Sequence, residues 1–374
     1  MKILITDPVS DSGIELIKES GFELIYETEL SDDEIKNIIS DVDGWIVRSG
    51  TKATKDLINA AGQLRVIGRA GVGVDNIDIL ASTLKGVLVI NTPDGNTISA
   101  AEHTMAMMSA VARNIQVAHS DMINGKWNRH AFVGSELRGK TLGIVGLGRI
   151  GIEVAKRARS FDMKIMGFDP YVNKDILKGK SIVLAELDEL TQQSDFITLH
   201  VPLIDSTRNL FDAKRLSMMK KTARIINVAR GGLINERDLS DALNDDVIAG
   251  AAIDVFETEP LVNDSPLLES KNILLTPHLG ASTTEAKEGV SLSICQQVVD
   301  YLKEEKMGNA LNMPVADMGI LRKISPYLSL SEIIGKIQMQ LATGPVKSLS
   351  IDCYGPIDQS NTVTLSFIKG LLEN

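Results

Sequence analysis

KTLGIVGLGRIGIEVAKRARSFDMKIMGFDP, from Lys140 to Pro170, is the stretch that decides the fold. Its first apolar run, 141–145, has the length of a strand, and a G-x-G-x-x-G pattern of glycines follows directly. Residues 152–160 then carry apolar side chains at helical spacing. A second apolar run, 164–168, ends on Asp169. The order strand, glycines, helix, strand and acid predicts a βαβ unit that binds a dinucleotide.

The three glycines are expected to serve different steric purposes. Gly146 allows a tight turn, Gly148 allows the backbone to approach a pyrophosphate, and Gly151 allows the helix to lie close to the strand. The N-terminus of the helix then presents unpaired N–H groups and the positive end of its dipole to the phosphates. The Asp169 carboxylate can accept hydrogen bonds from ribose hydroxyls and would repel a 2′-phosphate. We therefore predict NAD rather than NADP as the cofactor.

Length and composition limit the class of protein. A chain of 374 residues is too long for one ordinary core, so we expect two or three domains. The net charge of -10 argues against nucleic acid as a partner. The sequence offers no apolar run long enough for a membrane span, and its apolar N-terminal run is too short for a signal peptide. The only two cysteines, Cys295 and Cys353, lack metal-ligand spacing, so we expect a reducing, cytoplasmic compartment and no metal site.

Short apolar strands alternate with helical stretches over residues 1–97, and the same alternation of strands and helices resumes after Asp169. This alternation predicts an α/β fold with two doubly wound parallel-sheet domains, one flavodoxin-like and one of the Rossmann type. In such sheets ligands bind at the carboxyl ends of the strands. The Gly- and Asn-rich segments at those ends could also be ordinary turns. Arg48 is harder to explain in that way, because a guanidinium at the end of a buried strand needs an anion.

Two stretches do not follow this alternation. Residues 99–124 predict one long apolar helix that is either buried or part of an oligomer interface. Residues 313–374 predict a small α+β segment that is marginal as a core by itself and therefore docks or is incomplete. Its expected helical face consists of Leu330, Ile334, Ile337 and Leu341, and its expected half-buried strand contains Leu349, Ile351 and Cys353.

Hydride transfer requires a base for the hydroxyl proton and a cation that holds the substrate. His278 is the best base candidate, because it ends a predicted strand and a free imidazole titrates near pH 6.5. A structural role is the alternative, and we favour it for His200 beside Pro202. Arg230 precedes two glycines and can offer a two-pronged donor to a carboxylate. Glu259 could hydrogen-bond the imidazole, although an acid in so acidic a stretch is more often solvated.

Residues 40–310 resemble the D-isomer-specific 2-hydroxyacid dehydrogenases. The matching segments, in chain order, are VRSGTKAT, GRAGVGVDNID, NTPDGNTISAAEHT, GKWNR, GIVGLGRIG, INVARGGLI, AAIDVFETEP and TPHLGAST. The resemblance implies a catalytic triad of His278, Arg230 and Glu259. In that triad His278 takes the hydroxyl proton, Arg230 binds the substrate carboxylate and Glu259 supports His278.

The resemblance also implies ligand contacts and domain bounds. The implied cofactor-binding residues are Val72, Gly146, Gly148, Arg149, Ile150, Gly151, Asp169, Val201, Pro202, Val228, Asp254 and Gly280. The implied substrate-binding residues are Arg48, Ser49, Gly73, Asn96 and, from a neighbouring subunit of a homodimer or tetramer, Arg129. Residues 1–97 and 283–308 would form a substrate-binding domain, 98–282 an NAD-binding domain, and 309–374 the start of an intervening domain.

The implied substrate is a small anionic hydroxy or keto acid. The reaction that we expect is the NAD-dependent oxidation of D-3-phosphoglycerate to 3-phosphohydroxypyruvate, the first step of L-serine synthesis. Arg48 and Arg129 favour this reaction, because a phosphate needs cationic partners. An alternative is reduction of an unphosphorylated 2-keto acid such as hydroxypyruvate or glyoxylate. An alternative of another class is an NAD-sensing scaffold like the transcriptional corepressor that shares this fold and triad.

Overall fold

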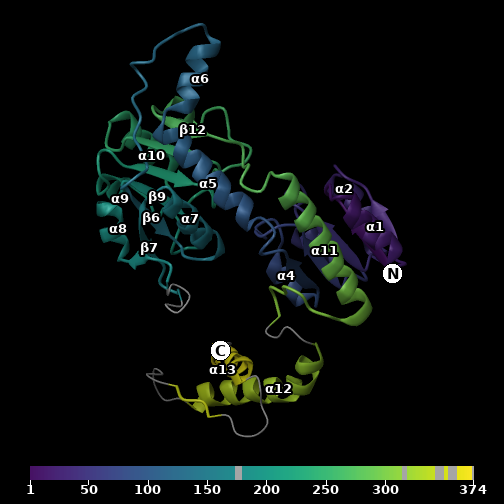
Figure 1. Ribbon diagram of the computed structural model, residues 1–374. Helices are drawn as coiled ribbons and strands as arrows, with labels where there is room; N and C mark the ends of the chain where they lie inside the picture. The colour runs from purple at the N-terminus through teal and green to yellow at the C-terminus, as the bar shows by residue number, and fades with distance from the viewer. Residues whose placement is uncertain (173–178, 314–317, 342–348, 353–359, 373–374) are drawn as a thin grey trace. The chain divides into compact units, whose positions relative to one another are not determined.

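The computed structural model describes residues 1–172, 179–313, 318–341, 349–352 and 360–372 (Figure 1). The chain divides into two compact units. One contains Met1–Pro93 with Glu288–Asn374, and the other contains Asp94–Lys287. Each unit is built on a parallel β-sheet, which confirms the predicted α/β fold with two parallel sheets.

The first unit contains a five-stranded sheet in the order β2-β1-β3-β4-β5, which is the flavodoxin-like order. Its strands are β1 (Lys2–Ile5), β2 (Glu23–Tyr26), β3 (Gly44–Val47), β4 (Val66–Arg69) and β5 (Leu88–Asn91). The helices that pack against this sheet are α1 (Asp11–Glu19), α2 (Asp32–Ile38) with the 3-10 turn η1 (Ile39–Asp41), α3 (Lys55–Ala60), α4 (Ile79–Leu84) and α11 (Thr284–Glu304), which begins in the last residues of the second unit. The side chains that cap the first four helices by accepting backbone N–H groups are Ser10, Ser31, Thr54 and Asp78.

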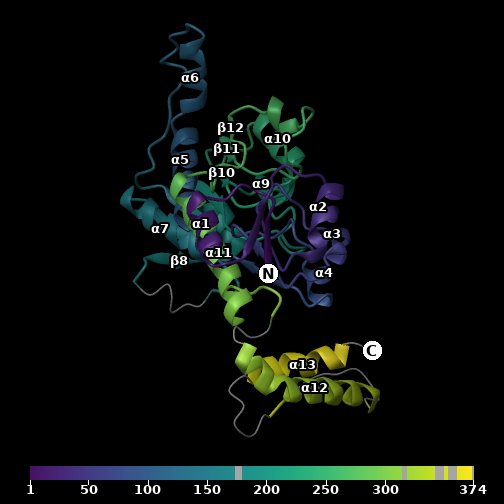
Figure 2. The same ribbon diagram turned by 90° about the vertical axis from the view of Figure 1, so that its right-hand side faces the viewer.

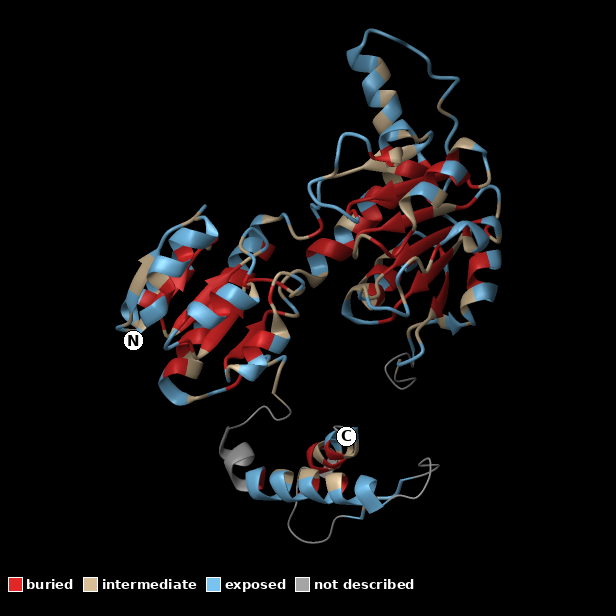
Figure 3. Ribbon diagram, turned by 180° about the vertical axis from the view of Figure 1, so that it is seen from behind, coloured by how far each residue is buried: buried red, intermediate tan, exposed pale blue. Residues whose placement is uncertain are grey.

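Helices cover both faces of this first sheet. α1 and α11 contribute apolar side chains to one face, and α2, α3 and α4 contribute them to the other. Trp45 of β3 is fully buried and donates its indole N–H to Thr6 Oγ1 at 3.0 Å. Figure 3 shows strands of buried residues between helices whose outer surfaces are exposed. Burial on both faces is why these strands are continuous apolar runs in the sequence.

The second unit contains a seven-stranded sheet in the order β12-β11-β10-β9-β6-β7-β8, which is the Rossmann order with one added edge strand. Its strands are β6 (Thr141–Val145), β7 (Lys164–Phe168), β8 (Ile182–Leu184), β9 (Phe196–Leu199), β10 (Arg224–Asn227), β11 (Gly250–Ile253) and β12 (Ile273–Leu275). Its helices are α5 (Thr97–Ala112), α6 (Ile115–Ile123), α7 (Arg149–Ser160), α8 (Leu187–Gln193), α9 (Ala213–Ser217), α10 (Glu236–Asn244) and the 3-10 helix η3 (Pro266–Glu269).

The second sheet is also covered on both faces. α5 and α7 lie on one face, and α8, α9 and α10 lie on the other. The strand order reverses between β6 and β9, and both of these central strands are buried. The carboxyl ends of the strands at such a reversal are where doubly wound sheets bind ligands. The glycine segment after β6 therefore lies at the position where this fold binds a dinucleotide.

The region that we predicted as one helix over 99–124 is two helices, so that prediction was wrong. Asn114 interrupts it with a left-handed backbone at φ 54°. The carbonyl of Ala112 instead accepts the backbone N–H of Ser135 at 2.8 Å. α5 is largely buried, whereas α6 has no buried residue and projects from the rest of its unit (Figures 1 and 2).

The described part of residues 313–374 contains α12 (Met318–Leu341) and α13 (Ser360–Leu372). They pack together, and Ser331 Oγ donates to the carbonyl of Val363 at 2.8 Å. Residues 349–352 are not in a strand, so the predicted strand is wrong there, and Cys353 lies outside the described residues. An isolated strand without a pairing neighbour leaves its backbone groups without partners. The side chains of the predicted α12 face are exposed, at 55%, 41%, 49% and 74% for Leu330, Ile334, Ile337 and Leu341.

Candidate active site

The glycine turn between β6 and α7 has the geometry that a dinucleotide requires. Gly146 has a φ of 97°, and an added Cβ there would lie 2.4 Å from the carbonyl oxygen of His200. A Cβ on Gly151 would lie 2.1 Å from the carbonyl oxygen of Gly146. A Cβ on Gly148 would meet no described atom within 4 Å. Two of the glycines are therefore required by the fold itself, while Gly148 leaves open space at the N-terminus of α7.

Asp169 is held at this turn by the backbone. One oxygen of its carboxylate accepts the N–H of Leu147 at 2.9 Å, and the other accepts the N–H of Tyr171 at 2.9 Å. A carboxylate has about four acceptor positions, so two backbone donors fix its orientation without filling it. The structure thus brings the end of β7 to the glycine turn, as the sequence pattern predicts for a ribose-binding acid.

Other predicted cofactor residues surround the same turn. Arg149 is the first residue of α7, and its Nε lies 2.6 Å from Asp94 Oδ1 in an exposed ion pair. Ile150 follows it and packs against the apolar core. The segment of Val201 and Pro202 follows β9, and Val201 Cγ1 would lie 2.9 Å from a Cβ on Gly146.

His278 and Glu259 form a hydrogen-bonded pair. His278 Nδ1 lies 2.7 Å from Glu259 Oε2, and the other carboxylate oxygen accepts the backbone N–H of Phe256 at 3.0 Å. Burial raises the pKa of Glu259, but the hydrogen bonds from His278 and Phe256 outweigh it and the pKa is lowered. His278 has a left-handed backbone at φ 55°, which is an unusual conformation for a residue other than glycine. Its backbone N–H holds this conformation by donating to the carbonyls of both Asp254 and Thr276.

Arg230 lies at the end of β10, close to the segment that carries Glu259. Its Nη1 donates to the carbonyl of Ala229 at 2.7 Å. Its own carbonyl accepts a hydrogen bond from Asn227 Nδ2 at 2.8 Å. A Cβ on Gly231 would lie 1.9 Å from the carbonyl oxygen of Phe256, so the two loops touch at the backbone. The structure therefore brings together the loops that carry all three predicted catalytic residues.

Asp254 follows β11 and is completely buried. Its carboxylate accepts the backbone N–H groups of Leu279 at 2.8 Å and Gly280 at 2.9 Å. Burial raises its pKa, but hydrogen bonds from His103, Thr276 and the backbone outweigh burial and lower it. Val228, another predicted cofactor residue, lies beside Gly280, with its Cγ1 3.0 Å from the position of a Cβ there.

The remaining predicted substrate residues fall in both units. In the first unit, Arg48 and Ser49 follow β3. Asp7 holds this loop by accepting the backbone N–H groups of Arg48 at 2.6 Å and Thr51 at 3.1 Å. Asn76 Nδ2 holds it from the other side by donating to the carbonyls of the same two residues, at 2.5 and 2.6 Å.

Val72 and Gly73 follow β4 in the first unit, and the carbonyl of Val72 accepts Asn91 Nδ2 at 2.6 Å. In the second unit, Asn96 occupies the N-cap position of α5 but makes no capping hydrogen bond, and its buried Oδ1 has no hydrogen-bond partner among the described residues. Arg129 lies in the exposed stretch that follows α6.

The sequence did not point to Asp7, Asn76 or His103, which hold the predicted residues in place. Asp7 and Asn76 look like ordinary turn residues in the sequence, and their partners are distant along the chain. His103 lies inside an apolar helix, 151 residues before its partner Asp254. Only the pairing of distant strands and helices brings such residues together.

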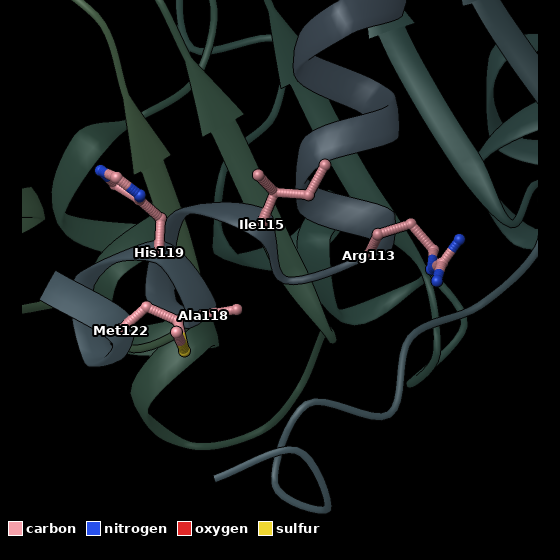
Figure 4. Close-up of a pocket in the computed structure, with 5 residues that line it drawn as sticks. All are labelled: Arg113, Ile115, Ala118, His119 and Met122. Atoms are coloured by element: carbon pink, nitrogen blue, oxygen red, sulfur yellow. The ribbon is translucent and has the colours of Figure 1, made fainter. Parts of the chain in front are cut away.

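A surface hollow lies where α5 meets α6. The residues that line it precede the glycine turn in the chain. It is lined by Arg113, Ile115, Ala118, His119 and Met122 (Figure 4).

The described ranges contain no group of three or more His, Cys, Asp or Glu residues that could hold a metal ion. Among the described helices, none has the length and apolar character needed to cross a bilayer.

Comparison with known proteins agrees with this geometry. Residues 105–280 match the family model described as D-isomer specific 2-hydroxyacid dehydrogenase, NAD binding domain. The D-3-phosphoglycerate dehydrogenase of Methanocaldococcus jannaschii is 45% identical over 375 residues, covering 100% of this chain and 71% of that protein. The enzyme of the same name from Bacillus subtilis is 42% identical, also over 100% of this chain and 71% of its own length.

Solved structures extend the comparison. The D-lactate dehydrogenase of Aquifex aeolicus, complexed with NAD and lactic acid, has a TM-score of 0.73 at 27% identity, over 84% of this chain and 100% of that chain. The TT0316 protein of Thermus thermophilus has a TM-score of 0.76 at 29% identity, over 83% of this chain and 100% of that chain. The chain belongs to the D-isomer-specific 2-hydroxyacid dehydrogenase family. It is an oxidoreductase with an NAD-binding domain.

Proposed function

We propose that this protein interconverts D-3-phosphoglycerate and 3-phosphohydroxypyruvate with NAD, at a site that contains His278, Arg230 and Glu259. The observation that carries the proposal is the 2.7 Å contact between His278 Nδ1 and Glu259 Oε2. A carboxylate on Nδ1 keeps the proton on that nitrogen, so Nε2 presents its lone pair. Nε2 makes no hydrogen bond within the described part of the chain, and the side chain is 49% exposed.

His278 acts as the base in this scheme. The proton of the substrate hydroxyl moves to His278 Nε2, which makes the imidazole a cation. The carboxylate of Glu259 lies against that cation and stabilises it. Arg230 holds the substrate carboxylate through its planar guanidinium, which fits two carboxylate oxygens. In the reverse direction, the protonated imidazole returns the same proton to the oxygen of the keto acid.

The residues around the glycine turn fit NAD. The open space at Gly148 and the N-terminus of α7 would take the pyrophosphate, because backbone N–H groups and the helix dipole favour anions there. Asp169 would accept hydrogen bonds from the ribose hydroxyls, and Asp254 would accept a hydrogen bond from the N–H of the nicotinamide carboxamide. When it is bound, NAD supplies the acceptor for the hydride of the substrate carbon.

The phosphorylated substrate is supported by two cations and by the relatives. Arg48 is positioned at the end of β3 by the bonds of Asp7 and Asn76 to its loop, and Arg129 is an exposed cation in the second unit. A phosphate needs such partners, whereas hydroxypyruvate or glyoxylate does not. The relatives that match this chain over its full length carry the name D-3-phosphoglycerate dehydrogenase.

We further propose a homodimer formed through α6 and the stretch after it. α6 has no buried residue. The exposed apolar side chains of this region are Ile115, Val117, Met122, Ile123, Trp127 and Val133, at 53%, 40%, 54%, 71%, 75% and 82%. Large exposed apolar surfaces of this kind mark protein interfaces. Such a dimer would make Arg129 available to the partner's site.

We also propose a division of the chain into three domains. Residues 1–97 with 283–308 would bind substrate, 98–282 would bind NAD, and 309–374 would form the start of an intervening domain.

Turnover of D-3-phosphoglycerate tests the proposal. Purified protein should reduce NAD with this substrate faster than with unphosphorylated D-2-hydroxy acids. His278→Asn, which cannot take the proton, should lower kcat by roughly a hundredfold to ten-thousandfold while leaving NADH affinity within about twofold. Tight NADH binding by the parent protein without turnover of any hydroxy acid would instead support the NAD-sensing scaffold.

A further inference from the structure

We propose that His103 of α5 is a positioning residue for the nicotinamide end of NAD, acting through Asp254. This inference rests on the proposed NAD site. His103 Nε2 lies 3.2 Å from Asp254 Oδ1 and 3.4 Å from Thr276 Oγ1. Both of these oxygens can accept a hydrogen bond, and one of them belongs to a carboxylate. Nε2 therefore carries the proton and donates it.

The two oxygens of Asp254 have different surroundings. Oδ1 receives three donors, which are His103 Nε2, Thr276 Oγ1 at 2.6 Å and the backbone N–H of Leu279 at 2.8 Å. Oδ2 receives the backbone N–H of Gly280 at 2.9 Å. Since a carboxylate oxygen accepts about two hydrogen bonds, Oδ1 is filled while Oδ2 can accept one more. The amide N–H of a carboxamide is a donor of the right kind for Oδ2.

His103 fixes Asp254 from a different element than its other partners. Leu279, Gly280 and Thr276 all belong to the stretch after β12, which also carries His278. His103 comes from α5, which also reaches this stretch where Ser99 Oγ donates to the carbonyl of Gly280 at 2.9 Å. α5 therefore holds both the carboxylate and the loop beside it.

A donor at residue 103 is needed for a chemical reason. Asp254 is completely buried, and a buried carboxylate is costly unless hydrogen bonds satisfy it. The side chain of His103 is 19% exposed, and its Nε2 lies within hydrogen-bond distance of Asp254 and Thr276. Without this donor, Asp254 would be held by the stretch after β12 alone, and its carboxylate would be fixed less firmly in the orientation that offers Oδ2 to a ligand.

Three ligands separate positioning from general stability. NADH carries the carboxamide, its reduced 3-acetylpyridine analogue has an acetyl group without an N–H, and ADP-ribose has no nicotinamide. We would measure the affinity of each by calorimetry for the parent protein, for His103→Leu and for His103→Gln. The glutamine variant is the matched control, because its amide N–H can still donate to Oδ1.

His103→Leu should weaken NADH binding by roughly tenfold, which is typical of losing a hydrogen bond to a charged group. It should weaken the acetylpyridine analogue by less than about threefold and leave ADP-ribose unchanged. His103→Gln should recover NADH affinity to within about threefold of the parent protein. His103→Asn, whose amide is too short to reach Asp254, gives the same test if the leucine variant does not fold.

Two outcomes would overturn the inference. Equal NADH affinity in the parent, leucine and asparagine proteins would show that His103 does not position Asp254. An equal loss for NADH and ADP-ribose would show a general effect on the domain. Failure of the proposed NAD site itself would be seen differently, as a parent protein that binds none of the three ligands, and failure of the proposed reaction alone as NADH binding without turnover.

Discussion

His278 Nδ1 and Glu259 Oε2 lie 2.7 Å apart, and Glu259 is in turn fixed by the backbone N–H of Phe256 at 3.0 Å. The carboxylate is thus oriented before any substrate arrives. This arrangement selects one tautomer of the imidazole, the one that presents the lone pair of Nε2. Its consequence is that the base and the group that stabilises its charged form are preorganised as a unit.

Glu259→Gln tests this unit. The amide keeps the size of the side chain but removes the negative charge that stabilises the imidazolium. We expect kcat to fall roughly tenfold to a hundredfold, with NADH affinity unchanged. Steady-state rates and NADH titrations measure the two effects separately. An unchanged kcat would mean that Glu259 has a structural role only.

Arg48→Gln tests the phosphate assignment. Losing one charged hydrogen-bond donor should raise KM for 3-phosphohydroxypyruvate roughly tenfold to a hundredfold. KM for hydroxypyruvate should change by less than about threefold, because that substrate has no phosphate. Both values come from NADH oxidation by the same enzyme preparation. Equal increases for the two substrates would remove the phosphate assignment.

Gly148→Ala and Gly151→Ala form a matched pair on the glycine turn. The alanine Cβ at residue 148 meets no described atom within 4 Å, so thermal stability should stay the same while NADH binds roughly tenfold more weakly. At residue 151 the Cβ would lie 2.1 Å from the carbonyl oxygen of Gly146. That variant should lose about 1–3 kcal/mol of stability. The reverse pattern, with the loss of stability at residue 148, would contradict the assignment of the open space to the pyrophosphate.

His200→Gln tests a pH effect on stability. Burial lowers the pKa of His200 to about 3. In the unfolded chain the pKa is about 6.5, so between these values the unfolded chain binds a proton that the folded chain does not. The free energy of unfolding should therefore fall as the pH drops below about 6.5, by about 2 kcal/mol at pH 5. Denaturant unfolding at pH 7 and pH 5 should show a smaller pH dependence in the glutamine variant, and an equal dependence would argue against burial of the neutral imidazole.

Mixed dimers test whether Arg129 serves the partner's site. Arg129→Ala and His278→Asn should each be nearly inactive on the phosphorylated substrate. If Arg129 acts across the dimer, a hybrid of the two variants contains one site with both residues intact. Random mixing of equal amounts should then restore about a quarter of the parent activity, since half of the dimers are hybrids with one working site in two. Activity no higher than that of the separate variants would place Arg129 in its own subunit's site.

The sequence predicted the parallel sheets and the glycine turn well, because both depend on local patterns. Strands buried on two faces are continuous apolar runs, and the three glycines each meet a local steric requirement. The prediction of a single helix over 99–124 failed at Asn114, where a hydrogen bond from Ser135 to the carbonyl of Ala112 replaces the helical one. That bond joins residues that are distant along the chain, so helical periodicity could not reveal it.

By itself, the sequence determined the α/β class, the two parallel sheets and the identity of the residues that could carry the chemistry. These follow from apolar periodicity, from glycine sterics and from the chemistry of each side chain. Only the tertiary structure decided which groups hold those residues. The pairing of β1 with β3 brings Asp7 to the Arg48 loop, and the packing of α5 brings His103 to Asp254. These pairings depend on strand order and helix packing, which no local pattern in the chain specifies.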